Sequence, residues 1–226
     1  MSTSTTIHRL RHARRANQGV SVPFDRAEQA AMIGAATAKI AELFDILQID
    51  HHNDHNTRDT PKRVSKMFVE EIMRGRYCAA PEITDFDNAE HYDQLIVTGP
   101  IDVRSTCAHH LMPFYGKAYI GILPAPKGRI IGLSKYDRVV DFFASRLQIQ
   151  EELVKQIGGF LVEKTAPSGL AVRISAVHMC KTQRGVRASH RGRMVSTAYW
   201  GALADDPALK SEFLQECIGL ERGGEG

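Results

Sequence analysis

Hydrophobic positions near the N-terminus of this chain recur at a helical period. Residues 24–47 carry apolar side chains at this spacing among strong helix formers, which predicts a long amphipathic helix. The segment that follows, residues 49–59, is polar and rich in histidine, and it is typical of a connecting loop. His51, His52 and His55 lie among Asp and Asn in this loop, and we assign them no function.

A second helix is predicted from Thr60 to about Arg76. Thr60 or Asp59 suits the N-cap position, and Pro61 suits the first helical position, where a missing N–H costs nothing. The start of this helix is therefore well marked in the sequence.

From Asp93 onward the pattern changes to short β-rich runs that alternate with helical ones. Runs such as KAYIGILPA alternate apolar and polar positions, as antiparallel strands do. The predicted order is strands at 94–103 and 117–125, helices at 134–146 and 149–165, strands at 171–179 and 195–203, and a final helix at 207–218.

This order predicts an α+β fold, with helices layered on one face of an antiparallel sheet and a helical extension at the N-terminal side. We expect three regions: a disordered basic tail over 1–22, a helical region over 23–80, and an α+β domain over 81–226.

Composition excludes several classes of protein. The 226 residues are 43% hydrophobic, no apolar run approaches the roughly 20 residues of a membrane span, and the N-terminus lacks the apolar centre of a secretory signal. A net charge of +3 is too small to indicate a nucleic-acid binder, although it suits an anionic ligand. We expect a cytoplasmic protein, in which the four cysteines are reduced, buried or metal-bound.

Two short stretches contain a candidate metal and acid/base constellation. STCAHH supplies Cys107, His109 and His110, and VHMC supplies His178 and Cys180. Zinc prefers thiolate and imidazole ligands, and three protein ligands leave its fourth position open for water. The pattern indicates hydrolytic chemistry.

Spacing suggests how these residues meet. On one strand, His178 and Cys180 would point to the same face, because side chains two apart do so. Cys107 and His110 are three apart, so the chain must turn between them, as in ordinary zinc motifs. A closed, purely structural site completed by His178 or His109 is the alternative, but the surplus of histidines favours catalysis.

Cationic side chains indicate a phosphate site. Ser134 occupies a predicted N-cap position, and Lys135 and Arg138 share a face of the helix that begins there. Arg184 follows Cys180 closely, and Arg63 and Lys66 lie three apart on the second helix. A capped surface helix with solvated cations is the alternative.

Gln150 and Glu151 open a predicted helix and offer an amide beside a carboxylate. Such a pair can hydrogen-bond a planar heterocycle that carries N–H and carbonyl groups. A Glu in a first helical turn can equally serve only the helix dipole.

Taken together and in this order, STCAHH, IGLSKYDR, Gln150-Glu151, VHMCKTQRG and DTPKRVSKM resemble the zinc-dependent GTP cyclohydrolase I family over roughly residues 24–214. The resemblance implies a tunnelling fold, in which sheets from several subunits join into barrels. It also implies a homodecamer with active sites between subunits, no nucleic-acid or membrane partner, and Zn²⁺ as cofactor.

The resemblance also assigns roles. Cys107, His110 and Cys180 would bind zinc, and His109 and His178 would be the catalytic acid/base groups. Substrate would be bound by Gln150 and Glu151 at guanine, and by Ser134, Lys135, Arg138, Arg184, Arg63 and Lys66 at the triphosphate and ribose, the last two from a neighbouring subunit.

The implied reaction is hydrolytic opening of the guanine imidazole ring of GTP, release of formate, and rearrangement to 7,8-dihydroneopterin triphosphate. This product feeds tetrahydrofolate biosynthesis and, in some organisms, biopterin or deazapurine pathways. A related purine or pterin enzyme and a zinc-stabilised nucleotide-binding regulator are the alternatives. The chain departs from the usual family pattern at Ala108, Leu147, Arg191 and Arg193.

Overall fold

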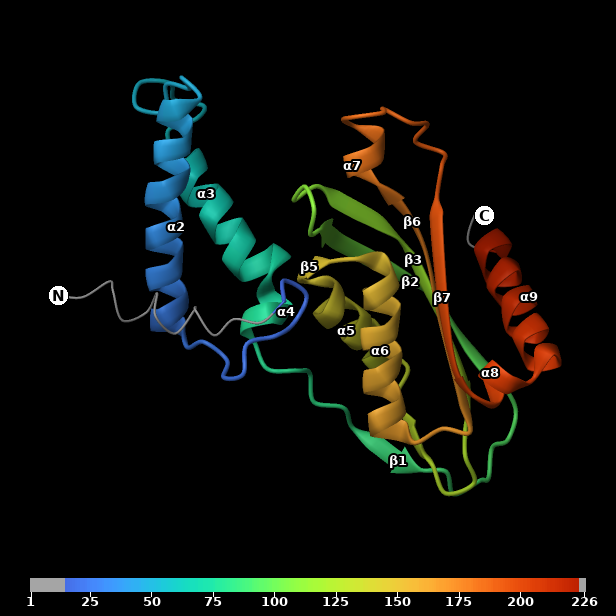
Figure 1. Ribbon diagram of the computed structural model, residues 1–226. Coiled ribbons are helices and arrows are strands. Elements are labelled where there is room, and N and C mark those ends of the chain that lie inside the picture. The colour runs from blue at the N-terminus through green and yellow to red at the C-terminus, as the bar shows by residue number, and fades with distance from the viewer. Residues whose placement is uncertain (1–14, 224–226) are drawn as a thin grey trace. The chain divides into compact units, whose positions relative to one another are not determined.

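A computed structural model describes residues 15–223, and the chain divides into an N-terminal unit up to Ala79 and a C-terminal unit from Ala80 (Figure 1). Of the predicted tail over 1–22, residues 1–14 lie outside the described residues. Within the described part, none of the helices combines the length and apolar character that crossing a membrane requires.

The first predicted helix is confirmed as α2, Arg26–Ile46. A capping box fixes its start: Asp25 Oδ1 accepts the Glu28 N–H at 2.8 Å, and Glu28 Oε2 accepts the Asp25 N–H at 3.0 Å. Half-buried side chains, among them Met32, Ala36, Ile40 and Phe44, recur every four residues along α2. No residue of the helix is buried, however, and the apolar Leu43 and Ile46 are exposed, so the expected amphipathic character is not found in this chain.

The second predicted helix is not one continuous α-helix. It consists of α3 (Thr60–Lys66), a wider π-helical stretch (Met67–Ile72) and α4 (Arg74–Tyr77). Asp59 occupies the N-cap position, but its side chain makes no capping hydrogen bond. Its carboxylate instead lies 3.4 Å from Nη2 of Arg63, so the start was predicted correctly and the interaction at it was not.

The C-terminal unit is built on a five-stranded sheet of order β5-β2-β3-β6-β7. Its neighbouring strands are antiparallel, except that the short β5 pairs with β2 in parallel. A separate two-stranded sheet pairs β1 with β4. The bounds are Asp85–Asp87 (β1), Ile96–Cys107 (β2), Pro113–Leu123 (β3), Arg129–Ile131 (β4), Leu147–Gln148 (β5), Gly169–His178 (β6) and Met194–Gly201 (β7).

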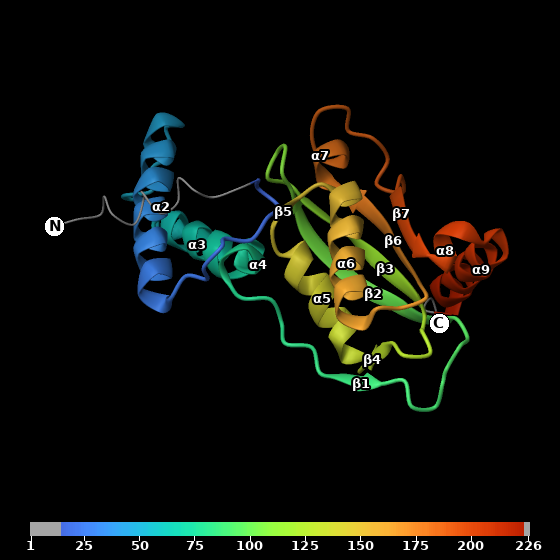
Figure 2. The ribbon, with the colours of Figure 1, turned by 60° about the horizontal axis from the view of Figure 1, so that its bottom comes forward.

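Two long helices, α5 (Ser134–Ala144) and α6 (Gln150–Thr165), cover one face of this sheet (Figure 2). Alternation along β3 separates two cores: Ala118 and Ile120 belong to the core under these helices, whereas Tyr119 belongs to the core on the other face. The helices α8 (Ala202–Asp205) and α9 (Pro207–Gly223) contribute Leu203, Phe213 and Cys217 to that second core.

One glycine allows α6 to approach β7 closely. A Cβ atom placed on Gly158 would lie 2.0 Å from Cη2 of Trp200, far inside van der Waals contact. Gly159, the next residue of the helix, would meet nothing within 4 Å. The packing of α6 on the sheet therefore requires glycine at position 158 but not at position 159.

The predicted α+β fold is confirmed, as are the four main strands and the three helices of the C-terminal unit, with ends that differ from the predicted ones by a few residues. The elements that were not predicted are short: β1, β4, β5, α8 and a helical turn, α7 (Met179–Thr182). Two of them, β5 and α7, border the candidate site.

Candidate active site

The first half of the site is the turn that ends β2. Cys107 is the last residue of the strand and is buried. Its N–H donates to the carbonyl of Met112 at 2.8 Å, and its carbonyl accepts the N–H of Leu111 at 2.9 Å. Leu111 has a left-handed backbone (φ 54°), which closes the turn tightly. The predicted turn between Cys107 and His110 is confirmed.

The second half is the end of β6, and here the sequence interpretation was wrong in one respect. His178 is the last residue of the strand, but Cys180 lies in α7 and not on the strand. Both residues nevertheless line one cavity. They share it because the chain coils at the end of the strand, and not through the two-residue repeat of a strand.

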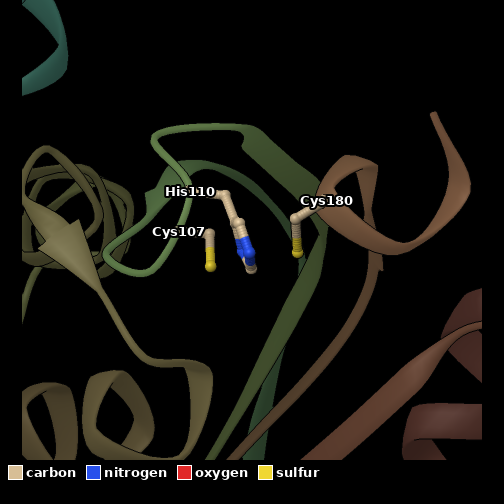
Figure 3. A group of neighbouring side chains, drawn as sticks. All are labelled: Cys107, His110 and Cys180. Atoms are coloured by element: carbon tan, nitrogen blue, oxygen red, sulfur yellow. The ribbon is translucent and has the colours of Figure 1, made fainter. Parts of the chain in front are cut away.

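These two chain turns bring Cys107, His110 and Cys180 together (Figure 3). Their ligand atoms, two sulfurs and one imidazole nitrogen, all lie within 4.8 Å of one another. Within residues 15–223, neither His109 nor His178 belongs to this group of mutually close atoms. The fold therefore brings three candidate metal ligands together from two chain turns.

The donor set fits a metal ion. Burial and the facing Cys107 side chain raise the pKa of Cys180, and Arg184 acts in the opposite direction. Two thiolates this close repel one another unless a cation lies between them. Two sulfurs with one imidazole form a donor set that suits zinc.

His178 is held by contacts on two sides. Its ring stacks on Phe114, with the centroids 4.6 Å apart and the planes 5° from parallel. Its Nε2 lies 2.7 Å from Oε1 of Gln150. Burial lowers its pKa, while the charge of Glu151 raises it and that of Lys181 lowers it further.

Gln150, the first residue of α6, is fully buried and its amide is engaged on both sides. Its Nε2 donates to the carbonyls of Ile174 at 3.1 Å and Met194 at 3.0 Å. Because carbonyls only accept hydrogen bonds, the amide nitrogen must face them and Oε1 must face His178. Glu151, the next residue, is exposed.

His109 is exposed on the turn after Cys107. Its Nδ1 lies 3.8 Å from Sγ of Cys107. The ring therefore borders the cluster, and it meets the ring of His110 edge-on with the centroids 6.4 Å apart.

A cavity of about 400 Å³ opens at this end of β6. Four of its lining residues were not among the predicted site residues, and two of these, Lys181 and Arg193, are cationic. The sequence around Lys181 gives no sign of a role at the site. Arg193, together with Arg191, belongs to the segment that departs from the usual family pattern. The lining residues are His178, Cys180, Lys181, Gly192, Arg193 and Met194.

The predicted phosphate-binding residues of α5 lie elsewhere in the same unit. Ser134 is the first residue of α5 and not its N-cap, which is Leu133, and no side chain caps this helix. Lys135 is half-buried and Arg138 is exposed. None of the three lines the cavity formed by the described residues.

The other predicted phosphate ligands are exposed cations. Arg184 follows α7 and acts electrostatically on Cys180. Arg63 and Lys66 lie on α3 in the N-terminal unit, and Lys66 Nζ lies 3.6 Å from the Glu70 carboxylate.

Comparisons with a family model and with individual proteins point to the same family. A sequence model of the family described as GTP cyclohydrolase I matches residues 36–218. The chain is 39% identical over 176 residues to GTP cyclohydrolase 1 of Shewanella denitrificans, covering 77% of this chain and 79% of that protein. It is 40% identical over 155 residues to GTP cyclohydrolase 1 of Carboxydothermus hydrogenoformans, covering 69% of this chain and 79% of that protein.

Proposed function

The chain belongs to the GTP cyclohydrolase I family, and we propose that the residues at the ends of β2 and β6 form the centre at which it opens the guanine ring of GTP. The reaction hydrolyses the imidazole ring, releases formate and yields 7,8-dihydroneopterin triphosphate. The observation that carries the proposal is the convergence of Cys107, His110 and Cys180 beside a histidine held in a fixed orientation.

In this proposal Cys107, His110 and Cys180 hold a zinc ion. Zinc bound there supplies Lewis-acid chemistry that makes hydroxide available near neutral pH. The three mutually close ligand atoms support this assignment, as does the repulsion that a cation would relieve between the two sulfurs.

His178 acts as the main acid/base group. Because Oε1 of Gln150 only accepts, Nε2 of His178 carries a hydrogen toward it, which leaves Nδ1 to exchange a proton with substrate. We assign to Nδ1 the proton delivered to the imidazole nitrogen of guanine as the ring opens. His109, exposed on the neighbouring turn, serves as a second acid/base group.

Glu151 recognises guanine. Its carboxylate is exposed at the start of α6, and its charge acts on His178, which supports a place beside the reacting ring. A carboxylate can accept two N–H groups of guanine at once and would be left unpaired by a base that lacks them. Gln150 was expected to share this role, but its amide is already occupied, so we assign it to positioning His178.

The triphosphate and ribose are bound by cations from more than one subunit. Ser134, Lys135, Arg138 and Arg184 contribute from one chain, and Arg63 and Lys66 contribute from a neighbouring chain. The charge of Arg184 acts on Cys180, which supports a place for this residue beside the cysteine cluster.

We propose a homodecamer with active sites between subunits. The edge strand β7 supports this, because Met194 and Val195 on it are exposed and one side of the strand lacks a hydrogen-bonding partner among the described residues. Pairing of β7 with a strand of another subunit would continue the sheet. We also propose a cytoplasmic location.

Incubation of metal-replete protein with GTP tests the function. We expect formate and a pterin chromophore, both lost on chelation and restored by zinc. Accumulation of a formylated pyrimidine would mean that the reaction stops after the first hydrolysis. Tight GTP binding without formate release would favour the nucleotide-binding regulator instead.

A further inference from the structure

A second group of metal-ligating side chains lies in the N-terminal unit, at the C-terminal end of α2. Asp45, His51 and His52 each offer one ligand atom, and these atoms all lie within 4.8 Å of one another. Oδ1 of Asp45 lies 3.1 Å from Nε2 of His51 and 3.5 Å from Nε2 of His52. The sequence presents only a polar, histidine-rich loop here, and the structure folds it onto a carboxylate.

The backbone of the loop is folded back by specific contacts. Gln48 adopts a left-handed conformation (φ 57°), and the N–H of Ile49 donates to the carbonyl of Phe44 at 2.9 Å. The Asp50 carboxylate then accepts the N–H groups of His52 at 3.1 Å and Asn53 at 3.0 Å. These bonds hold both histidines beside the last turn of the helix.

The imidazole of His51 is also fixed by packing. It is 7% exposed and meets the ring of Phe44 edge-on, with the centroids 5.9 Å apart. The centroids of the His51 and His52 rings lie 4.0 Å apart. Both Nε2 atoms lie near the same carboxylate oxygen, Oδ1 of Asp45, so the three candidate ligand atoms are already gathered in one place.

Electrostatics at this position favour a cation. Asp45 lies in the last turn of α2, where the helix dipole is negative, and no basic residue lies in that turn. A carboxylate there is unfavourable unless positive charge lies beside it.

The distances match those around a bound metal. Two ligands about 2.0 Å from a tetrahedral ion are separated by about 3.3 Å. The two carboxylate–imidazole distances, 3.1 Å and 3.5 Å, bracket this value.

We propose that Asp45, His51 and His52 bind a divalent late first-row transition metal ion, with zinc as the representative, and that this ion ties the loop over 47–59 to the end of α2. One carboxylate and two imidazoles suit such an ion, and the exposed side of His52 leaves a further position for water. The site shares no residue with the cysteine cluster, so it is independent of the proposed catalytic function.

The test is zinc stoichiometry of the full-length, untagged chain after equilibrium dialysis, measured by elemental analysis. We expect two zinc ions per chain in the wild type and one in His52→Ala or Asp45→Asn. Both of these side chains are largely exposed, so neither change removes core packing. His55→Ala is the matched control, because His55 lies on the same loop but faces Asp54.

Variants of Cys180 distinguish zinc bound at the loop site from zinc bound at the cysteine cluster. Cys180→Ala is expected to bind one zinc, and Cys180→Ala with His52→Ala none. The inference is wrong if His52→Ala and Asp45→Asn bind as much zinc as the wild type. If Cys180→Ala alone retains full stoichiometry, the cysteine cluster is wrongly assigned and the loop site is unaffected.

Discussion

Oε1 of Gln150 lies 2.7 Å from Nε2 of His178, and this contact ties the histidine to the backbone of two strands. The same amide donates to Ile174 on β6 and Met194 on β7. A hydrogen bond to an acceptor that cannot reverse its role fixes both the orientation and the tautomer of the imidazole. Gln150 thereby links His178, the proposed acid/base group, to the backbone of the sheet.

Replacing His178 and Cys180 should separate proton transfer from metal binding. We expect His178→Ala to keep its zinc and lose ring opening by about 10²–10⁴-fold, because a positioned acid/base group contributes that much. Cys180→Ala should lose zinc and activity together. Zinc content and formate release check both variants. Loss of zinc from His178→Ala would make His178 a ligand and revive the closed site.

Gln150→Ala and Glu151→Ala should affect different kinetic constants. Removing the Gln150 amide frees His178 to rotate, so kcat should fall by about 10²-fold with little change in KM. Removing Glu151 takes away the carboxylate proposed to bind guanine, so KM should rise. Steady-state kinetics with GTP give both constants.

NMR can show directly whether Gln150→Ala releases the His178 ring, independently of the kinetic constants. The ring protons of His178, followed by NMR, should lose their single fixed environment in Gln150→Ala and keep it in Glu151→Ala. An equal rise of KM in both variants would place Gln150 at the substrate instead.

Gly158→Ala should destabilise the C-terminal unit. Its Cβ would lie 2.0 Å from the ring of Trp200, and overpacking of this kind costs about 1–3 kcal/mol. Gly159→Ala, one residue on, meets nothing within 4 Å and should be neutral or stabilise by up to about 1 kcal/mol through helix propensity. Urea unfolding measures both. Equal effects at the two positions would contradict the close approach of α6 and β7.

Asp102 should make stability depend on pH at the acidic end. A hydrogen bond from Lys117 at 2.5 Å holds the pKa of Asp102 below its usual value, with Arg104 adding to the effect. Since the folded-state pKa is depressed, the stabilisation is present above the unfolded pKa of about 3.9 and is lost as pH falls through the folded value. The pair is exposed, so we expect at most about 1 kcal/mol.

A double-mutant cycle of Asp102→Asn and Lys117→Met measures this coupling. The free energy of unfolding should show coupling at pH 7 that diminishes below about pH 4. Coupling that stays constant down to pH 2.5 would mean that the carboxylate is not the source.

Local sequence was sufficient to predict a helix or strand where its apolar residues follow a single regular spacing. The apolar run in KAYIGILPA predicts β3, which is buried on both faces, and the apolar spacing after Ile149 predicts α6, which buries one face. The turn between Cys107 and His110 was also predictable. Residues three positions apart on a strand point to opposite faces, so the chain must turn if both are to bind one ion.

Local sequence was insufficient where the outcome depends on a distant partner. Cys180 was expected on a strand, but the chain coils into α7 there, and Ser134 was expected to cap a helix that no side chain caps. Gln150 looked like a substrate ligand because nothing near it in sequence reveals that two carbonyls and a histidine occupy its amide.

The sequence by itself determined the α+β fold and identified the candidate ligand residues, because hydrophobic period and ligand type are properties of short segments. Tertiary structure decided which of those residues meet. It placed Cys107 near Cys180, and His51 and His52 near Asp45. Hydrogen-bond partners and distances between ligand atoms are fixed only when the chain has folded and its segments pack together.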